Sequence, residues 1–420
     1  MQRRIPRLTA GLVAAAGVLA LTACGSGFSG SSSSSSSGAA GGLTSSRSAL
    51  TVLIGSSGDA ETAAVKSAVA DWSGSSGTKA TVQAATNLTQ QLSQGFAAKK
   101  PADVFYLGAD TFASYAKQGN LLAYGDQLKN KGDFYPSLVK NFTYDGKFTC
   151  APKDFSTLQL EINTDLWKAA GLTDKDVPTT WDQLATVAKK LTKGKVTGLV
   201  TSNEYQRLGA FMVQAGGNLT NDDNTKATVD SAANKQALTY VQNGLKAGWW
   251  KFTKDVGAGW GGEAFGKGVA AMTIEGNWIS GAMQSDFPKI TYQVAPLPAG
   301  PSGKGTLQFT NCWGIAKDSP NQAAALKLVE QLTSSSDQLA FAKAFGVMPS
   351  IQSAAGDWKS QYPQFAAFLD AASYAKGVPT AVGANDVVTD MNSKLASLKS
   401  ADIASILSAE QKNLSAVVTG

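Results

Sequence analysis

The sequence predicts an α/β fold in which strands and helices alternate along most of the chain. Residues 50–107 alternate as strand, helix, strand, helix, strand, and a second alternating set follows residue 150. The chain has 420 residues, which is enough for two bodies that each bury a core of their own. We therefore expect two mostly parallel sheets, each flanked by helices.

The first set of elements begins at residue 50. The expected strands are Leu50–Gly55, Ala80–Ala84 and Ala102–Leu107. A helix is expected over Asp59–Trp72, where Val65, Val69 and Trp72 share one face. Another helix should run to Lys100 from Asn87, because the Asn side chain can accept a hydrogen bond from an early helical N–H.

The second set of elements lies between residues 158 and 295. The expected strands are Leu158–Asn163, Gly198–Thr201, Val269–Ile274 and Tyr292–Ala295. The expected helices are Trp181–Leu191, Arg207–Gln214 and Ser231–Ala247. Residues 321–346 and 361–420 are rich in alanine, which favours helix, and we expect them to be mostly helical.

Ligands of open parallel sheets bind beyond the carboxyl ends of the strands. In the first set, two of these ends are followed by the loops 55–61 and 107–112. The sequence therefore predicts that a binding site includes residues of both loops.

The N-terminus carries an export sequence. Arg3, Arg4 and Arg7 form a basic start, and small and apolar residues follow as far as residue 23. A charged start and a short apolar stretch that ends in small residues are typical of a secretory signal, here residues 1–23. The paired arginines leave twin-arginine export open beside the general route.

Leu21-Thr22-Ala23-Cys24 resembles a bacterial lipobox, in which the Cys thiol is acylated and begins the mature protein. Residues 24–47 include seven consecutive serines and would form a flexible tether with a reach of roughly 25–30 Å. The alternative is ordinary cleavage beside an incidental Cys24. Acylation would hold the protein at the extracellular face of the cytoplasmic membrane.

Composition excludes several classes of function. The formal charge is +6, and three of the basic residues lie in the export sequence, so no nucleic-acid partner is expected. The chain has no histidine, which excludes a Ser-His-Asp triad, a Cys-His pair and a His-ligated zinc site.

If Cys24 is acylated, Cys150 and Cys312 remain. In an oxidising exterior such a pair most often forms a disulfide, and two free buried thiols are the alternative.

Several segments, taken in order, resemble one protein family. They are Asp145–Pro152, Leu160–Trp167, Ala169–Leu172 with Pro178–Leu184, Phe265–Met272 followed by Glu275–Trp278, Ala295–Pro298, and Trp313–Ile315. Together they resemble the extracellular solute-binding proteins of carbohydrate ABC importers, in the maltose-binding-protein-like branch. Ile162 departs from the family pattern, which usually has Tyr before Asn163.

The resemblance implies a periplasmic-binding-protein-like fold of two lobes with a ligand cleft between them. Lobe one would comprise residues 48–150 and 313–348, and lobe two residues 153–310 and 350–420. Crossing strands would form a hinge at 150–153, 310–313 and 348–350. The two cysteines would then lie on neighbouring hinge strands, which favours the disulfide.

A sugar site needs aromatic rings against the C–H faces and planar polar groups around the hydroxyls. Trp260, Trp278 and Trp313 lie between glycines or at the ends of elements, where each ring either lines the cleft or packs in the core. The polar candidates come from the expected cleft loops. They are Asp59, Glu61, Asp110, Asp154, Tyr205, Arg207, Glu275, Asn277 and Asn311.

Several of these candidates have a second interpretation. Asp59, Asp110 and Asp154 equally suit the N-terminus of a helix, where a carboxylate is favourable. Arg207 would also suit an anionic substrate.

The resemblance implies a monomeric, lipid-anchored receptor that has no catalytic activity and no cofactor. It would capture a mono- or oligosaccharide in the cleft and deliver it to an ABC permease. The rival hypotheses are a receptor for a polyamine, peptide or anion, a cell-surface glycoside hydrolase with two carboxylates, and an adhesion module.

Overall fold

The computed structural model describes residues 42–418. The predicted export sequence, Cys24 and most of the predicted tether lie outside the described residues. Between residues 42 and 418, no helix combines the length and the apolar character needed to cross a bilayer.

Five elements of the first half agree closely with the sequence prediction. They are β1 (Leu50–Ile54), α1 (Asp59–Ser76), β2 (Ala80–Ala84), α2 (Leu88–Ala97) and β3 (Val104–Gly108). The structure adds elements that the sequence analysis did not predict, namely α3 (Ala109–Lys117), α4 (Pro136–Asn141) and the short strands β4 (Thr143–Tyr144) and β5 (Lys147–Phe148). The side chain of Asn87 caps α2 by accepting a hydrogen bond from the N–H of Gln90 at 3.0 Å. β1 pairs in parallel with both β2 and β3, so this part of the sheet is parallel as expected.

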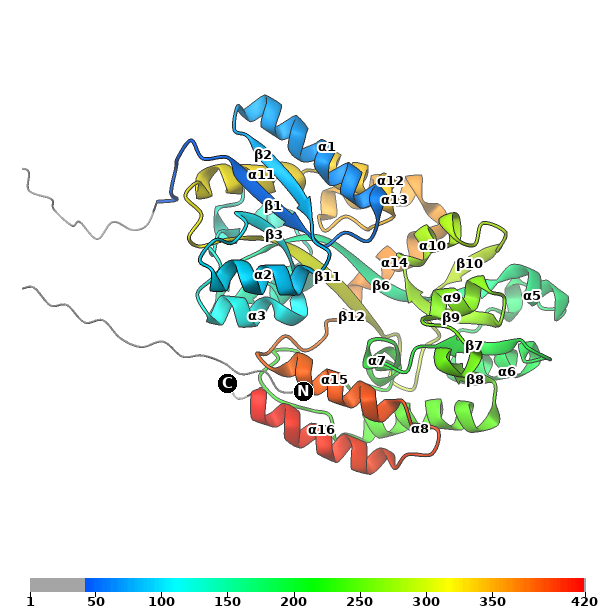
Figure 1. The fold of residues 1–420 in the computed structure, drawn as a ribbon. Coiled ribbons are helices and arrows are strands. Elements are labelled where there is room, and N and C mark those ends of the chain that lie inside the picture. The colour runs from blue at the N-terminus through cyan, green and yellow to red at the C-terminus, as the bar shows by residue number, and fades with distance from the viewer. Residues whose placement is uncertain (1–41, 419–420) are drawn as a thin grey trace, which may run out of the picture. The chain divides into compact units, whose positions relative to one another are not determined.

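The second half repeats the alternation of strands and helices. Its elements are α5 (Thr164–Ala169), α6 (Trp181–Leu191), β7 (Thr197–Thr201), α7 (Tyr205–Gln214), α8 (Ala232–Ala247), β8 (Trp250–Phe252), α9 (Gly261–Gly266), β9 (Ala270–Gly276), α10 (Ile279–Ser285) and β10 (Tyr292–Ala295). β7 pairs in parallel with β8 and β9. In Figure 1 these elements lie opposite β1, β2 and β3.

Two long strands join the halves, β6 (Ala151–Asn163) and β11 (Thr306–Ile315). Figure 1 shows them running side by side between the two groups of elements. The sheet order is β2-β1-β3-β11-β6-β9-β7-β8; β6 is antiparallel to both of its neighbours, β11 and β9, and β11 is also antiparallel to β3. The sheet is therefore mixed, and the expectation of mostly parallel sheets holds only for its outer strands.

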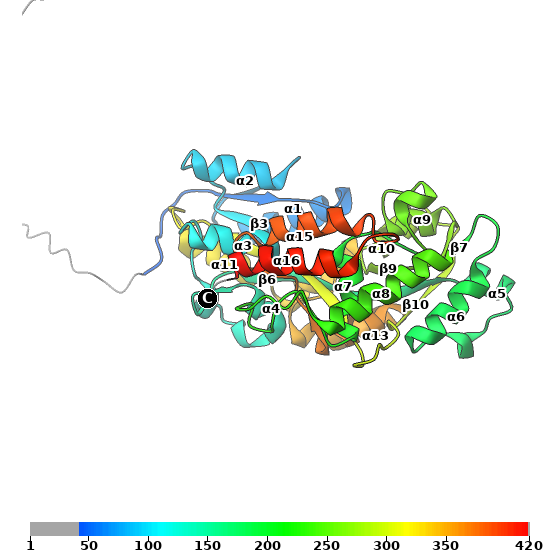
Figure 2. The ribbon, with the colours of Figure 1, turned by 90° about the horizontal axis from the view of Figure 1, so that it is seen from below.

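The C-terminal segments cover both halves. They are α11 (Gln322–Leu332), α12 (Ser335–Phe345), α13 (Ala355–Gln361), α14 (Ala366–Asp370), β12 (Ala375–Lys376), α15 (Ala384–Leu395) and α16 (Ile403–Val417). Residues 377–383 are not helical as expected, because Pro379 lacks an N–H and Gly383 has a φ of 86°. α15 contacts both α7 and α3, and Figure 2 shows α15 and α16 lying across the molecule from below.

The buried apolar side chains form two large clusters. One contains residues from 50–151 and 312–354, and the other contains residues from 158–307 and 384–418. We use lobe one and lobe two for these two packed bodies. The predicted lobe boundaries stay a prediction; Ile351 and Ala354 pack in the cluster of lobe one, although the prediction placed residues 350–420 in lobe two.

A disulfide joins Cys150 to Cys312, as predicted, with 5.7 Å between the Cα atoms. Cys150 directly precedes β6 and Cys312 lies in β11, and both side chains are fully buried. The bridge therefore ties the two crossing strands together where they leave lobe one. An isolated bridge joins Phe155 of β6 to Met348, beside the segment 348–350 for which a third crossing is predicted.

Candidate functional site

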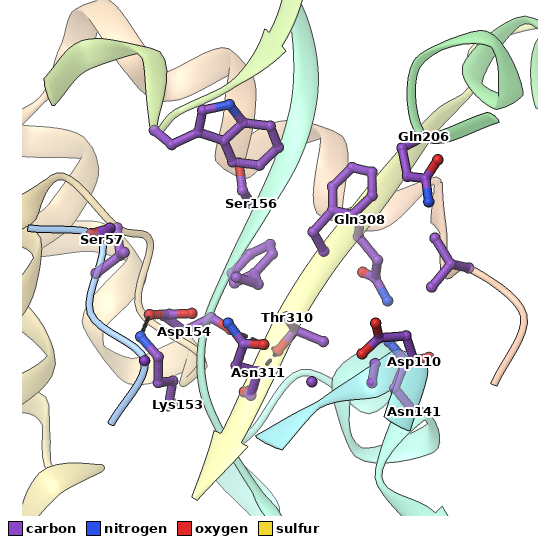
Figure 3. A pocket seen from close by; sticks show the side chains of 18 of the residues that line it. Ser57, Asp110, Asn141, Lys153, Asp154, Ser156, Gln206, Gln308, Thr310 and Asn311 are labelled. Carbon is purple, nitrogen blue, oxygen red and sulfur yellow. Dashed lines mark hydrogen bonds and ion pairs between the residues drawn. The ribbon is translucent and has the colours of Figure 1, made fainter. Parts of the chain in front are cut away.

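A cavity of about 450 Å³ lies between the lobes, which is within the usual size range for small-molecule sites. Its walls come from the ends of β1, β3 and β9, from the crossing strands β6 and β11, and from α7 and α15. Figure 3 shows polar side chains from these elements pointing toward a common space. The cavity lies beyond the carboxyl ends of β1 and β3, as expected for an α/β sheet.

Both predicted loops reach the cavity. Ser57 and Glu61 come from the first loop, and Gly108 and Asp110 come from the second. A Cβ atom built on Gly108 would overlap with Oδ1 of Asp110, so a larger residue at this position would force the carboxylate to move. Asp110 lies in the first turn of α3, where a carboxylate is favourable.

A β-bulge shapes the wall formed by β6. Asn311 of β11 faces Asp154, but the next residue, Cys312, faces Pro152, so Lys153 is the extra residue on β6. Successive residues of a regular strand point to opposite faces, whereas a bulge re-aims one of them. Lys153 and Asp154 both line the cavity, and the regular residues Phe155 and Ser156 that follow them line it as well.

Lys153 is the centre of a buried ion cluster. Its Nζ lies 3.2 Å from Oε1 of Glu61, contacts the Asp154 carboxylate, and lies 4.4 Å from the ring centroid of Tyr106. Burial lowers the pKa of Lys153, but the charges of Asp154 and Glu61 outweigh it and raise the pKa above its usual value. The ammonium group is therefore charged and already neutralised by two carboxylates.

The two carboxylates respond differently to the cluster. Burial raises the pKa of Glu61, but Lys153 and the hydrogen bonds from Ser57 outweigh it, so the net shift is downward. At Asp154 burial outweighs the attraction of Lys153, and the pKa is raised. Glu61 accepts hydrogen bonds from both the N–H and the hydroxyl of Ser57, which fixes the loop after β1.

Trp278 is the large apolar side chain left exposed among residues 42–418, at 36 %. Its indole Nε1–H donates a hydrogen bond to Oε2 of Glu275 at 3.0 Å. The Arg207 guanidinium pairs with the same oxygen at 2.6 Å and lies 5.3 Å from the Trp278 ring centroid. Phe309 packs edge-on against the ring, with 5.7 Å between centroids. The ring is therefore held in one orientation at the cavity wall.

The rest of the polar lining is rich in amides, which both donate and accept hydrogen bonds. The lining amide side chains are Asn141, Gln206, Asn277, Gln308, Asn311 and Asn385. Asn277 is held in place because its Nδ2 donates to the carbonyl of Gly346 at 2.5 Å. Within the described range, no group of three His, Cys, Asp or Glu residues is arranged to hold a metal ion.

The cavity brings together only some of the residues predicted from the sequence. Those in its lining are Glu61, Asp110, Asp154, Asn277, Trp278 and Asn311. Glu275 and Arg207 lie behind the Trp278 ring and hold it. Asp59 and Trp260 line a neighbouring cavity, described below.

Two predicted aromatic residues lie in the cores instead. Trp313 is 1 % exposed and packs edge-on against Tyr106, with 4.7 Å between the ring centroids. Tyr205 is fully buried, and its hydroxyl donates to Asn218 at 2.7 Å. Trp313 therefore packs in the core, which is the alternative that the sequence analysis left open for it.

The sequence analysis missed part of the lining. The missed polar residues are Ser57, Asn141, Lys153, Ser156, Gln206, Gln308, Thr310 and Asn385. A usable indication was present in the crossing strands, where polar residues interrupt segments that are otherwise buried and apolar. The contributions from α7 and α15 depend on how distant segments pack, which the sequence pattern does not show.

Comparisons with known proteins agree with this architecture. A binding protein of Brucella abortus (strain 2308) is 24% identical over 309 residues, which cover 70% of this chain and 74% of that protein. The diacetylchitobiose binding protein DasA of Streptomyces coelicolor is 28% identical over 283 residues, which cover 64% of this chain and 65% of DasA.

Among solved structures, the cyclic alpha-maltosyl-1,6-maltose binding protein of Arthrobacter globiformis superimposes with a TM-score of 0.78 at 19% identity. The match covers 89% of this chain and 99% of that one, and it shows a shared two-lobed fold. The family model described as "Bacterial extracellular solute-binding protein" matches residues 69–367. The chain therefore belongs to the bacterial extracellular solute-binding proteins.

Proposed function

We propose that this protein is the receptor of a carbohydrate ABC importer. It is anchored through Cys24 at the extracellular face of the membrane, captures a sugar between its lobes, and delivers it to the permease. The hinge is a two-state element whose closed form is favoured by the contacts that the ligand makes with the second lobe.

The observation that carries this proposal is the pairing of one exposed indole with a rim of amides. Trp278 presents the exposed aromatic surface at the cavity, and Asn141, Gln206, Gln308 and Asn311 surround the same space. An aromatic ring covers the C–H face of a sugar, while amides match hydroxyls that donate and accept at once.

The charges at the cavity argue against the other ligand classes. An anion would need a free cation, but the lining ammonium group of Lys153 is already paired with Glu61 and Asp154. A polyamine would need several free carboxylates, and of the lining carboxylates only Asp110 has no ion pair in the described part of the chain. The lining therefore holds no unpaired cation for an anionic ligand and only one unpaired carboxylate for a cationic one, while most of its polar groups are uncharged amides and hydroxyls that suit a neutral sugar.

The ion pairs of Lys153 with Glu61 and Asp154 also argue against a hydrolytic role. Glycoside hydrolysis needs two carboxyl groups that act on the substrate as acid and as base or nucleophile. Glu61 and Asp154 share one buried lysine, which leaves Asp110 as the one lining carboxylate without an ion pair in the described residues, so no two unpaired carboxylates face the cavity. DasA and the Arthrobacter globiformis protein are both named for sugar ligands, which supports the proposal for this chain.

A thermal-shift screen against sugars, amino acids, polyamines and short peptides tests the proposal, with calorimetry on each hit. A ligand that binds only the folded state raises the melting temperature with concentration. Saturable stabilisation by a sugar class, weakened in Trp278→Ala, is the expected result. Stabilisation by polyamines or peptides alone would overturn the sugar assignment but keep the receptor.

The anchor is tested separately in cells. The expected result is that the protein fractionates with membranes, and that Cys24→Ala releases it or leaves it unprocessed. Release of the unaltered protein into the medium would overturn the lipid anchor without affecting the binding proposal.

A further inference from the structure

A second cavity, of about 680 Å³, lies beside the first. Its walls come from the loop before α1, from α10, from the end of α12, and from α13 and the turn that follows it. Trp260, Tyr362 and Phe365 line it, and all three are only partly buried. This cavity therefore offers aromatic surface on the same cleft but outside the site described above.

The two cavities are continuous around one ring. Ser57, Glu61, Trp278 and Phe345 line both of them. Of these, Trp278 comes from lobe two, and its indole is fixed by Glu275. A rigid ring that borders two compartments contacts a ligand in either one, and it lies beside any ligand that extends through both.

The lining of the second cavity has the same chemical character as the first. Besides its aromatic residues it contains the hydroxyl groups of Ser280 and Ser285 and the amide of Gln284. Its ionisable groups are Asp59, Glu61 and Asp286 on the acidic side and Lys343 on the basic side, and Glu61 is already paired with Lys153. Aromatic surface with hydroxyl and amide groups again suits a neutral carbohydrate.

We propose that the second cavity continues the binding site past Trp278, and that the ligand is an oligosaccharide that occupies both compartments. This inference rests on the proposed function, because it extends the same sugar site. A monosaccharide is too small to extend from the first compartment into the second and would leave the aromatic residues of the second without a partner.

A helical glycine allows the second compartment to be filled selectively. Gly281 of α10 lines the second cavity and not the first, and a Cβ atom built there meets nothing within 4 Å. Gly281→Trp therefore places an indole at the second compartment without a clash at its Cβ. Gly74→Trp is the matched control, since Gly74 is an exposed glycine of α1 whose Cβ also meets nothing within 4 Å and which lines neither cavity.

The experiment is calorimetry of the full-length protein with two series of probes from monomer to hexamer. The probes are α-1,4-linked glucose and β-1,4-linked N-acetylglucosamine oligosaccharides. The expected result is that, in one series, affinity rises at least tenfold from the shortest ligand that binds to the longest. Gly281→Trp should abolish this rise while it keeps the affinity for the shortest ligand within about twofold, and Gly74→Trp should change neither.

Two results would overturn the inference while leaving the proposed function intact. One is an affinity that is the same for every length of a series that binds. The other is a rise with length that persists in Gly281→Trp. If no sugar of any length binds, while another ligand class stabilises the protein, then the sugar assignment itself fails and the inference fails with it.

Discussion

The indole of Trp278 and the carboxylate of Glu275 are joined by a 3.0 Å hydrogen bond, although Glu275 is fully buried and Trp278 is the exposed wall of the cavity. Arg207 completes the arrangement by pairing with the same carboxylate oxygen. A buried ion pair thus orients an exposed ring. A ring that is already ordered loses less conformational entropy on binding, which favours affinity.

Replacing Trp278 with Ala should reduce sugar affinity at least tenfold, because the ring supplies the aromatic surface of the first compartment. Stability should change by no more than about 1 kcal/mol, since the side chain is 36 % exposed. Calorimetry and urea unfolding measure the two effects. Trp278→Phe, which keeps a ring, should retain part of the affinity; equal affinity of the Ala variant and the unaltered protein would contradict the assigned role.

Glu275→Ala should lower the free energy of unfolding by about 3 kcal/mol, because it leaves the Arg207 guanidinium buried without its partner. Arg207 is 12% exposed, which places the estimate at the low end for buried pairs. Sugar affinity should also fall, since the indole loses its acceptor. Urea unfolding measures the loss of stability, and calorimetry of the same preparation measures the loss of sugar affinity.

A double variant separates charge from packing. Glu275→Leu combined with Arg207→Met removes both charges and should recover part of the lost stability. If the double variant is no more stable than Glu275→Ala, the loss comes from packing and the ion pair contributes little.

Glu161 should make stability fall with rising pH. Its side chain is fully buried on β6, Oε1 has no partner, and Oε2 accepts the N–H of Glu275 at 3.0 Å. Burial, together with the nearby charge of Glu275, raises the pKa of Glu161 well above the ordinary value of 4.5. The folded protein therefore holds this proton more tightly than the unfolded chain does.

Linkage gives the sign of the effect. The contribution of Glu161 is fully present below pH 4.5 and is lost as pH rises through the raised pKa of the folded state. Glu161→Gln, which mimics the protonated acid, should flatten the pH dependence and be more stable than the unaltered protein at pH 8. Urea midpoints from pH 4 to 9 test this, with the exposed Asp318→Asn as control. An unchanged pH slope in Glu161→Gln would show that the buried acid is not responsible.

Removing the disulfide should cost stability but not binding. The bridge closes a loop with a sequence separation of 162, for which chain entropy predicts roughly 4–5 kcal/mol. The free energy of unfolding of the double variant Cys150→Ala, Cys312→Ala, measured by urea titration, should be lower by this amount. Because both sulfurs lie where the strands leave lobe one, sugar affinity should stay within about twofold. A tenfold loss of affinity in the folded variant would instead show that the bridge sets the shape of the cleft.

Much of the fold was predictable because local patterns determine it. Asn87 caps α2 as expected, and α6 spans Trp181–Leu191 as expected. The length of β6 was underestimated, because the expected strand began at Leu158 whereas the observed strand begins at Ala151. Polar residues such as Lys153 and Asp154 interrupt the apolar pattern there and are buried only because the two lobes enclose them.

The site was predictable where a strand end or a motif marks it. Asp110 follows β3, and Trp278 follows the Glu-Gly-Asn motif, and both line the cavity. Trp313 could not be assigned, because the choice between cleft and core depends on which face of β11 it occupies beside Tyr106. Gln206 and Asn385 come from helices whose approach to the cleft is set by long-range packing.

The bulge at Lys153 also explains how β6 can carry an additional charged residue while the side chains farther along the strand keep their alternation between the two faces of the sheet. A one-residue slip normally exchanges the two faces of a strand. Here two residues of β6 face one of β11, so the slip is absorbed locally. Leu158, Leu160 and Ile162 still reach the core of lobe two. One extra residue has thus given the cavity wall a cation, at the cost of a single irregular step in the ladder that connects the lobes.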